Sequence, residues 1–193
     1  MRLYRSDQAV LKRLVSLQTS TDSAAEVLHP PDKTPPFANP DALYRAYAGK
    51  QLLPLPRNAR ALGLAYSQDM GSLAKSVGAS PAAYRGLRTP ALDMLIELAA
   101  RVRALSGGAG PLLVDSTVTD GHYQQKLGDG DPSPTTGYTF TIARRYVRRS
   151  QAFAFQAMLD RLQALNLIAW ERFSSVIEVT VASDAARAIV DGP

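Results

Sequence analysis

Four segments between Asp115 and Val181 decide the fold, namely DSTVTDGHYQQKL at 115–127, TTGYTFTIARRY at 135–146, QAFAFQAMLDRLQALN at 151–166 and LIAWERFSSVIEVTV at 167–181. In the last segment Ile177 alternates with Glu178, which is typical of a strand and places these two side chains on opposite faces. β-branched and aromatic residues predict strands over 137–142, 167–172 and 175–181. The third segment carries apolar residues at helical spacing and predicts a helix over 151–165.

Upstream of these segments, the clearest signal is a helix over 90–105. We expect Thr89 to cap it, because Pro90 then occupies the first helical position. A strand over 111–115 follows directly. Together these elements predict an α+β fold, in which a small, mainly antiparallel sheet carries helices packed on one side. We expect the four predicted strands to form one sheet and the helices 90–105 and 151–165 to pack against it.

The N-terminal third is less regular. The spacing of apolar residues predicts a helix over 7–18, and the prolines between 30 and 40 predict an extended strap. We expect a short helix over 41–49. These observations divide the chain into an N-terminal helix and strap, residues 1–56, and one domain, residues 57–193. Residues 57–77 read as helical pieces broken at two glycines, and 184–190 as a short terminal helix.

Composition narrows the classes of function. The 193 residues carry a formal net charge of +5 and no cysteine, which excludes thiolate metal sites and disulfides. Much of the positive charge lies in Arg144, Arg145, Arg148 and Arg149, which we expect to be solvated. No nucleic-acid motif accompanies them, so no specific nucleic-acid binding is expected. The sequence predicts neither a membrane span nor a signal peptide.

Two short motifs suggest a family. Ser116 is followed by Tyr123-Gln124 on a predicted short helix, and Gly137 precedes Phe140 in the next predicted strand. In order and spacing these residues resemble the LAS-type zinc D-alanyl-D-alanine carboxypeptidases, of the hedgehog/DD-peptidase-like group, which trim peptidoglycan peptides. The resemblance implies a DD-peptidase-like fold with a substrate groove. It also implies a location in the bacterial cell envelope.

The residues that carry the chemistry of that family are replaced. Thr119 stands where the family has the Arg that binds a substrate carboxylate. Pro134, Thr141 and Glu178 stand where it has the His, Asp and His zinc ligands. Peptide hydrolysis by one zinc ion needs three protein ligands, and proline has no ligating group. We therefore expect no cofactor and interpret the chain as a non-catalytic homologue that keeps the groove as a surface for peptide or peptidoglycan binding or for scaffolding. The resemblance places the following residues along that groove: Ser116, Thr119, Tyr123, Gln124, Pro134, Thr141 and Glu178.

Two alternatives stay open. One is an active cell-wall peptide hydrolase with a rebuilt zinc site, formed by His122 and Glu178 with Asp120 or Asp131. The other is a structural domain that binds a protein partner through the strap or the arginine cluster.

Overall fold

The computed structural model describes residues 28–29, 33–128 and 130–185. The predicted helices 7–18 and 184–190 lie wholly or almost wholly outside these residues. The α-helices are α3 (Pro40–Ala48), α4 (Thr89–Leu105), α5 (Gly121–Leu127) and α6 (Arg149–Ala164). The strands are β1 (Leu53–Pro54), β2 (Leu64–Tyr66), β3 (Gly86–Leu87), β4 (Leu112–Ser116), β5 (Thr139–Ala143), β6 (Ile168–Arg172) and β7 (Val176–Val181). The 3₁₀ segments are η1 (Ala59–Leu62), η2 (Ser72–Val77), η3 (Ala83–Arg85) and η4 (Ser133–Thr136).

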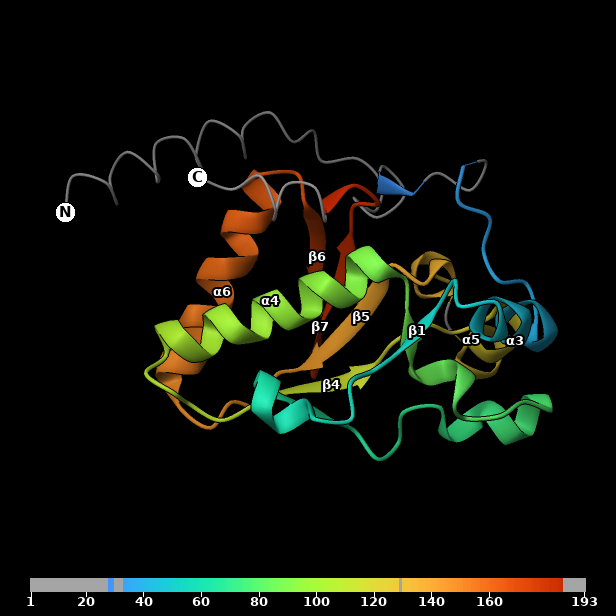
Figure 1. The fold of residues 1–193 in the computed structure, drawn as a ribbon, viewed down its shortest axis with the longest axis horizontal. Coiled ribbons are helices and arrows are strands. Elements are labelled where there is room, and N and C mark those ends of the chain that lie inside the picture. The colour runs from blue at the N-terminus through green and yellow to red at the C-terminus, as the bar shows by residue number, and fades with distance from the viewer. Residues whose placement is uncertain (1–27, 30–32, 129, 186–193) are drawn as a thin grey trace.

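The described residues form a main sheet of five strands in the order β2-β4-β5-β7-β6. β2 runs parallel to β4, and the other neighbouring strands are antiparallel. Figure 1 shows α4 crossing this sheet with α6 beside it. The predicted α+β class is confirmed, as is the single sheet formed by the four predicted strands.

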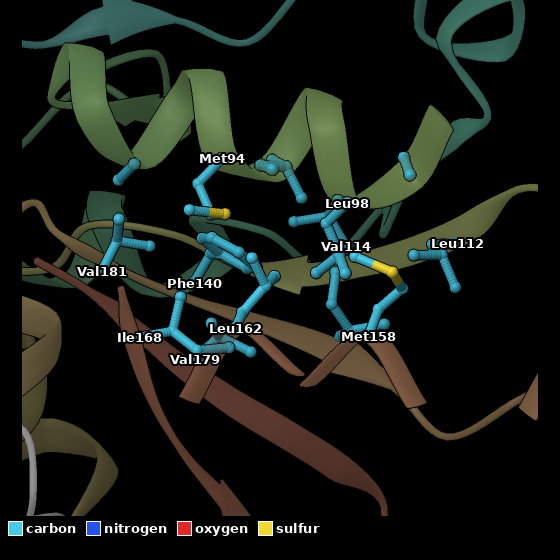
Figure 2. Close-up of a cluster of buried hydrophobic side chains, with 14 of the residues drawn as sticks. Met94, Leu98, Leu112, Val114, Phe140, Met158, Leu162, Ile168, Val179 and Val181 are labelled. Atoms are coloured by element: carbon cyan, nitrogen blue, oxygen red, sulfur yellow. The ribbon is translucent and has the colours of Figure 1, made fainter. Parts of the chain in front are cut away.

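One face of the sheet is apolar and holds the main core. Phe140 and Ile142 of β5 and Val179 of β7 are fully buried there. They pack with Met94 and Leu98 of α4 in the same cluster as residues of α6 (Figure 2). Burial of such side chains contributes about 1.5–3 kcal/mol each to folding. This face therefore supplies most of the cohesion of the fold.

A second, smaller core lies between α3, α5 and η3. The side chains of Leu43, Leu52, Tyr84 and Tyr123 are buried in it. The strap joins this core at Phe37, whose backbone N–H donates to Thr135 O at 2.8 Å and whose carbonyl accepts from Gly121 N at 2.9 Å. The described part of the N-terminal segment thus packs on the rest of the chain.

Gly137 is required where η4 meets β5. Its φ of 79° is in the left-handed region, and a Cβ there would lie 2.8 Å from Leu52 Cδ2. The side chain of Arg88 lies next to this glycine and donates from Nε to Thr136 O at 2.9 Å. It also lies over the rings of Phe37 and Tyr138. The motif glycine therefore has a packing role.

Several boundaries differ from the prediction. Residues 57–77 are not only helical pieces, because β2 intervenes and pairs with β4 far along the chain. Tertiary pairing here overrides local propensity. Thr89 is not the cap of α4, since the helix begins at Thr89 and Arg88 occupies the N-cap without a side-chain hydrogen bond. The Arg88 side chain is committed to Thr136 O instead.

The arginine cluster is exposed at Arg145, Arg148 and Arg149. Arg144 differs, because it is half-buried and donates from Nη1 to Phe173 O at 3.0 Å and to Ser174 O at 2.9 Å. It therefore fastens the β6–β7 hairpin rather than joining a solvated patch. No helix in the described part of the chain is both long and apolar enough to cross a bilayer.

Candidate binding cavity

The second face of the sheet is polar where four strands meet. Thr141 of β5 lies opposite Glu178 of β7, and Glu178 lies opposite Glu171 of β6. On the other side Thr141 pairs with Ser116 of β4, whose backbone N–H and Oγ lie 3.0 and 2.8 Å from Thr141 Oγ1. One row of polar side chains therefore runs across β4, β5, β7 and β6.

A β-bulge in β4 brings Ser116 into this row. Val114 pairs with Ile142 on the core side, and Ser116 pairs with Thr141. β4 thus advances by two residues where the antiparallel β5 advances by one. The extra residue is Asp115. Bulges re-aim side chains in this way and are common beside functional sites. The end of β4 thus turns both Asp115 and Ser116 toward a cavity.

The cavity has a volume of about 460 Å³. This lies within the range of roughly 300–1,000 Å³ that is usual for sites of small ligands. Its walls come from the segment 69–73, the chain from the end of β4 into α5, and the polar face of β5 and β7. The structure brings all seven groove positions of the sequence analysis to this wall, which are Ser116, Thr119, Tyr123, Gln124, Pro134, Thr141 and Glu178.

Asp120 anchors α5 at the edge of the cavity. It is fully buried and accepts hydrogen bonds at Oδ1 from His122 N at 2.8 Å and Tyr123 N at 3.2 Å, as an N-cap does. Its Oδ2 accepts a hydrogen bond from Tyr84 Oη. Burial, and after it the bond to Asp120, raises the pKa of Tyr84 well above its usual range. Asp120 is therefore a structural carboxylate, because both of its oxygens accept hydrogen bonds from within the chain.

Two buried polar atoms in the cavity wall lack hydrogen-bond partners within the described part of the chain. Thr119 and Gln124 are each 5% exposed. Among the described residues, neither Thr119 Oγ1 nor Gln124 Oε1 has a hydrogen-bond partner. Leaving such a group unpaired costs about 1–3 kcal/mol, and native proteins satisfy nearly all of them. The backbone N–H of Thr119 donates to Pro134 O at 3.0 Å, which fixes Thr119 beside Pro134.

The cavity also holds carboxylates that the sequence analysis did not single out. Asp115 and Asp69 line it together with Glu178, and no Lys, Arg or His is among the described residues of its wall. Asp115 directly precedes Ser116. It was not predicted to line the cavity because the β-bulge that turns it there cannot be seen in the sequence. Asp69 could not be found from sequence, because 57–77 was interpreted as helical pieces.

The residues do not fit a zinc ion. No group of three His, Cys, Asp or Glu side chains in the described part of the chain could hold a metal. His122 is exposed, and neither it nor Asp131 lines the cavity. Asp131 Oδ1 instead accepts from Ser133 N at 2.8 Å. The alternative site of His122, Glu178, Asp120 and Asp131 is therefore not assembled.

The other histidine, His29, is buried away from the cavity. Its Nε2 donates to Val181 O, and its ring stacks on Tyr138 with centroids 4.0 Å apart. Burial lowers the pKa of His29, with a smaller lowering by Arg88 and a partial offset by the bond to Val181. Among the described residues Nδ1 has no partner, which agrees with a neutral ring. His29 is thus part of the fold.

Comparisons with protein-family models, with curated proteins and with solved structures found no match for this chain. The likeness to the zinc carboxypeptidases therefore rests on the motif positions themselves.

Proposed function

We propose that this chain is a non-catalytic, DD-peptidase-like domain that binds a peptide, such as a peptidoglycan stem peptide, in the cavity on the polar face of the sheet. The observation that carries the proposal is that the seven positions chosen from the motifs all line one cavity of about 460 Å³. Those positions span Ser116 to Glu178, and different strands and loops bring them together.

Hydrolysis is disfavoured by the residues at the three positions where the resembling family has zinc ligands. Pro134 has no ligating atom, and Thr141 Oγ1 is occupied by its contacts with Ser116. Glu178 alone could not hold zinc, which needs three protein ligands in a catalytic site. The residues at these positions are thus better suited to holding a peptide than to cleaving it.

Binding is tested by blocking the cavity. Ser72 is exposed and lines it, whereas Ser76 is exposed on the same 3₁₀ segment and does not. We expect a stem pentapeptide that ends in D-Ala-D-Ala to bind the wild-type chain and Ser76→Trp equally in calorimetric titration. Ser72→Trp should weaken binding at least tenfold, because the indole fills the space. No binding to wild type, or equal binding to both variants, would refute the proposal.

Metal content separates this proposal from the hydrolase alternative. The purified chain should hold less than one zinc per molecule and release no D-Ala from the pentapeptide. The triple change Pro134→His, Thr141→Asp and Glu178→His should raise zinc affinity, because three ligands would then line one cavity. One tightly held zinc per wild-type chain would contradict this proposal and support the hydrolase alternative.

A further inference from the structure

We infer that the ligand of this cavity presents a protonated amine to Asp115, and that the cavity does not bind a ligand by its carboxylate end. The inference deepens the proposed function and rests on it. It reverses the polarity expected of the resembling family, in which an arginine would face a carboxylate.

The charges of the wall carry the first step. Asp115 is half-buried at the bulge, and the exposed Asp69 also lines the cavity. Glu178 lines it too and has an interaction of its own, so Asp115 and Asp69 are the carboxylates assigned to the ligand. Within the described wall no cationic side chain offsets them. A partly desolvated concave site of one charge sign attracts the opposite charge.

This local field opposes the charge of the whole chain, which is formally +5. Charges beyond about 8 Å are largely screened at physiological ionic strength. Arg144 borders the wall through its hydrogen bonds to the backbone oxygens of Phe173 and Ser174, but the charged side chains in the described lining of the cavity are all carboxylates, and these set its preference. An acidic cavity in a basic protein is selective for a cationic group on an otherwise neutral or acidic ligand.

The unpartnered atoms are the second and independent observation. Gln124 Oε1 is a hydrogen-bond acceptor, and Gln124 is 95% buried in the wall, its exposed fraction being 5%. Thr119 Oγ1 can accept as well. An ammonium group has three donors and no acceptor. It can donate to an amide oxygen such as Gln124 Oε1 and to a carboxylate, whereas a ligand carboxylate can donate to neither.

Thr119 explains why a carboxylate is not recognised. It stands where the resembling family has an arginine, and no cationic side chain in the described wall replaces that guanidinium group. A ligand carboxylate would meet Asp115 and Asp69 without a partner for its charge. Like charges placed together in this way disfavour binding.

The test uses three forms of one peptide, Ala-γ-D-Glu-Lys-D-Ala-D-Ala, titrated calorimetrically into the wild-type chain. The forms are the free peptide, the peptide with both amines acetylated, and the peptide with its C-terminal carboxylate amidated. We expect acetylation to raise Kd about tenfold or more, since a charge-assisted hydrogen bond contributes roughly that factor. Amidation should leave Kd unchanged or lower it.

Variants locate the effect. Asp115→Asn and Gln124→Met should each raise Kd for the free peptide several-fold and leave Kd for the acetylated peptide nearly unchanged. Asp93→Asn, an equal charge change at an exposed site on α4 outside the cavity, is the matched control and should change neither. Equal binding of free and acetylated peptide would overturn the amine inference while the proposed binding function stands. Absence of binding by all three forms would overturn both.

Discussion

The two faces of the main sheet are built from the same strands and differ in what they hold. On β5, Phe140 and Ile142 are fully buried against α4 and α6, whereas Thr141 between them faces the cavity. On β7, Val179 joins the core and Glu178 joins the cavity wall. The side chains of the core face are buried against the apolar side chains of α4 and α6. The cavity beside the polar face is also lined by Thr119, which follows β4, and by Gln124 of α5, and their buried Oγ1 and Oε1 atoms have no partners in the described part of the chain. Stability is thus concentrated on one face, and the proposed binding function belongs to the other.

The largest difference is expected between neighbouring residues of β5. Phe140→Ala should lower the free energy of unfolding by about 3–5 kcal/mol, because it opens a cavity in the core. Thr141→Ala removes the contacts with Ser116 and should cost only about 1 kcal/mol. Urea denaturation of both variants measures this. Similar losses of unfolding free energy in the two variants would mean that stability is not concentrated on the apolar face.

A smaller but substantial effect is expected at the edge of the cavity. Asp120→Ala removes the cap of α5 and leaves the buried Tyr84 hydroxyl unpaired, so it should cost about 2–3 kcal/mol. Asp120→Asn keeps an oxygen that can cap and should cost less. Thermal or urea unfolding compares them. If Asp120→Ala were as stable as the wild type, Asp120 would not be the structural carboxylate described here.

The smallest effect is a dependence on pH that arises at His29. The folded state holds this ring neutral with a pKa below the usual value of about 6.5, so the unfolded state takes up a proton first as pH falls. The contribution of the neutral ring to the free energy of unfolding should therefore be fully present above about pH 6.5. Below that pH it should decline by at most about 1.4 kcal/mol per pH unit until the folded-state pKa is reached.

His29→Gln, which keeps a neutral donor for Val181 O, should flatten that decline. His122→Gln changes an exposed ring and is the control. Denaturant titrations at several pH values between 7 and 5 measure the slopes. An unchanged slope in His29→Gln would show that His29 is not held neutral by burial.

Much of this division could be predicted from sequence. Alternation in 175–181 predicted that Glu178 and Ile177 face opposite sides, since side chains alternate along any strand. The motif positions predicted the residues that the structure gathers at the cavity. The bulge at Asp115 was missed because register depends on the partner strand. The contribution of Asp69 was missed because β2 is fixed by pairing with β4, which is distant in sequence. The unpartnered state of Gln124 depends on the whole tertiary environment and has no local signal.

The central claim is that the polar face binds and the apolar face does not, and amide chemical-shift mapping tests it most directly. The ¹⁵N-labelled chain is titrated with the free stem pentapeptide. We predict that the largest shifts fall between Asp115 and Gln124, at Thr141, and between Val176 and Glu178. Amides of α6 around the exposed Phe153 should stay unchanged. Shifts centred on α6 or the arginine cluster, with none along the cavity, would contradict the account.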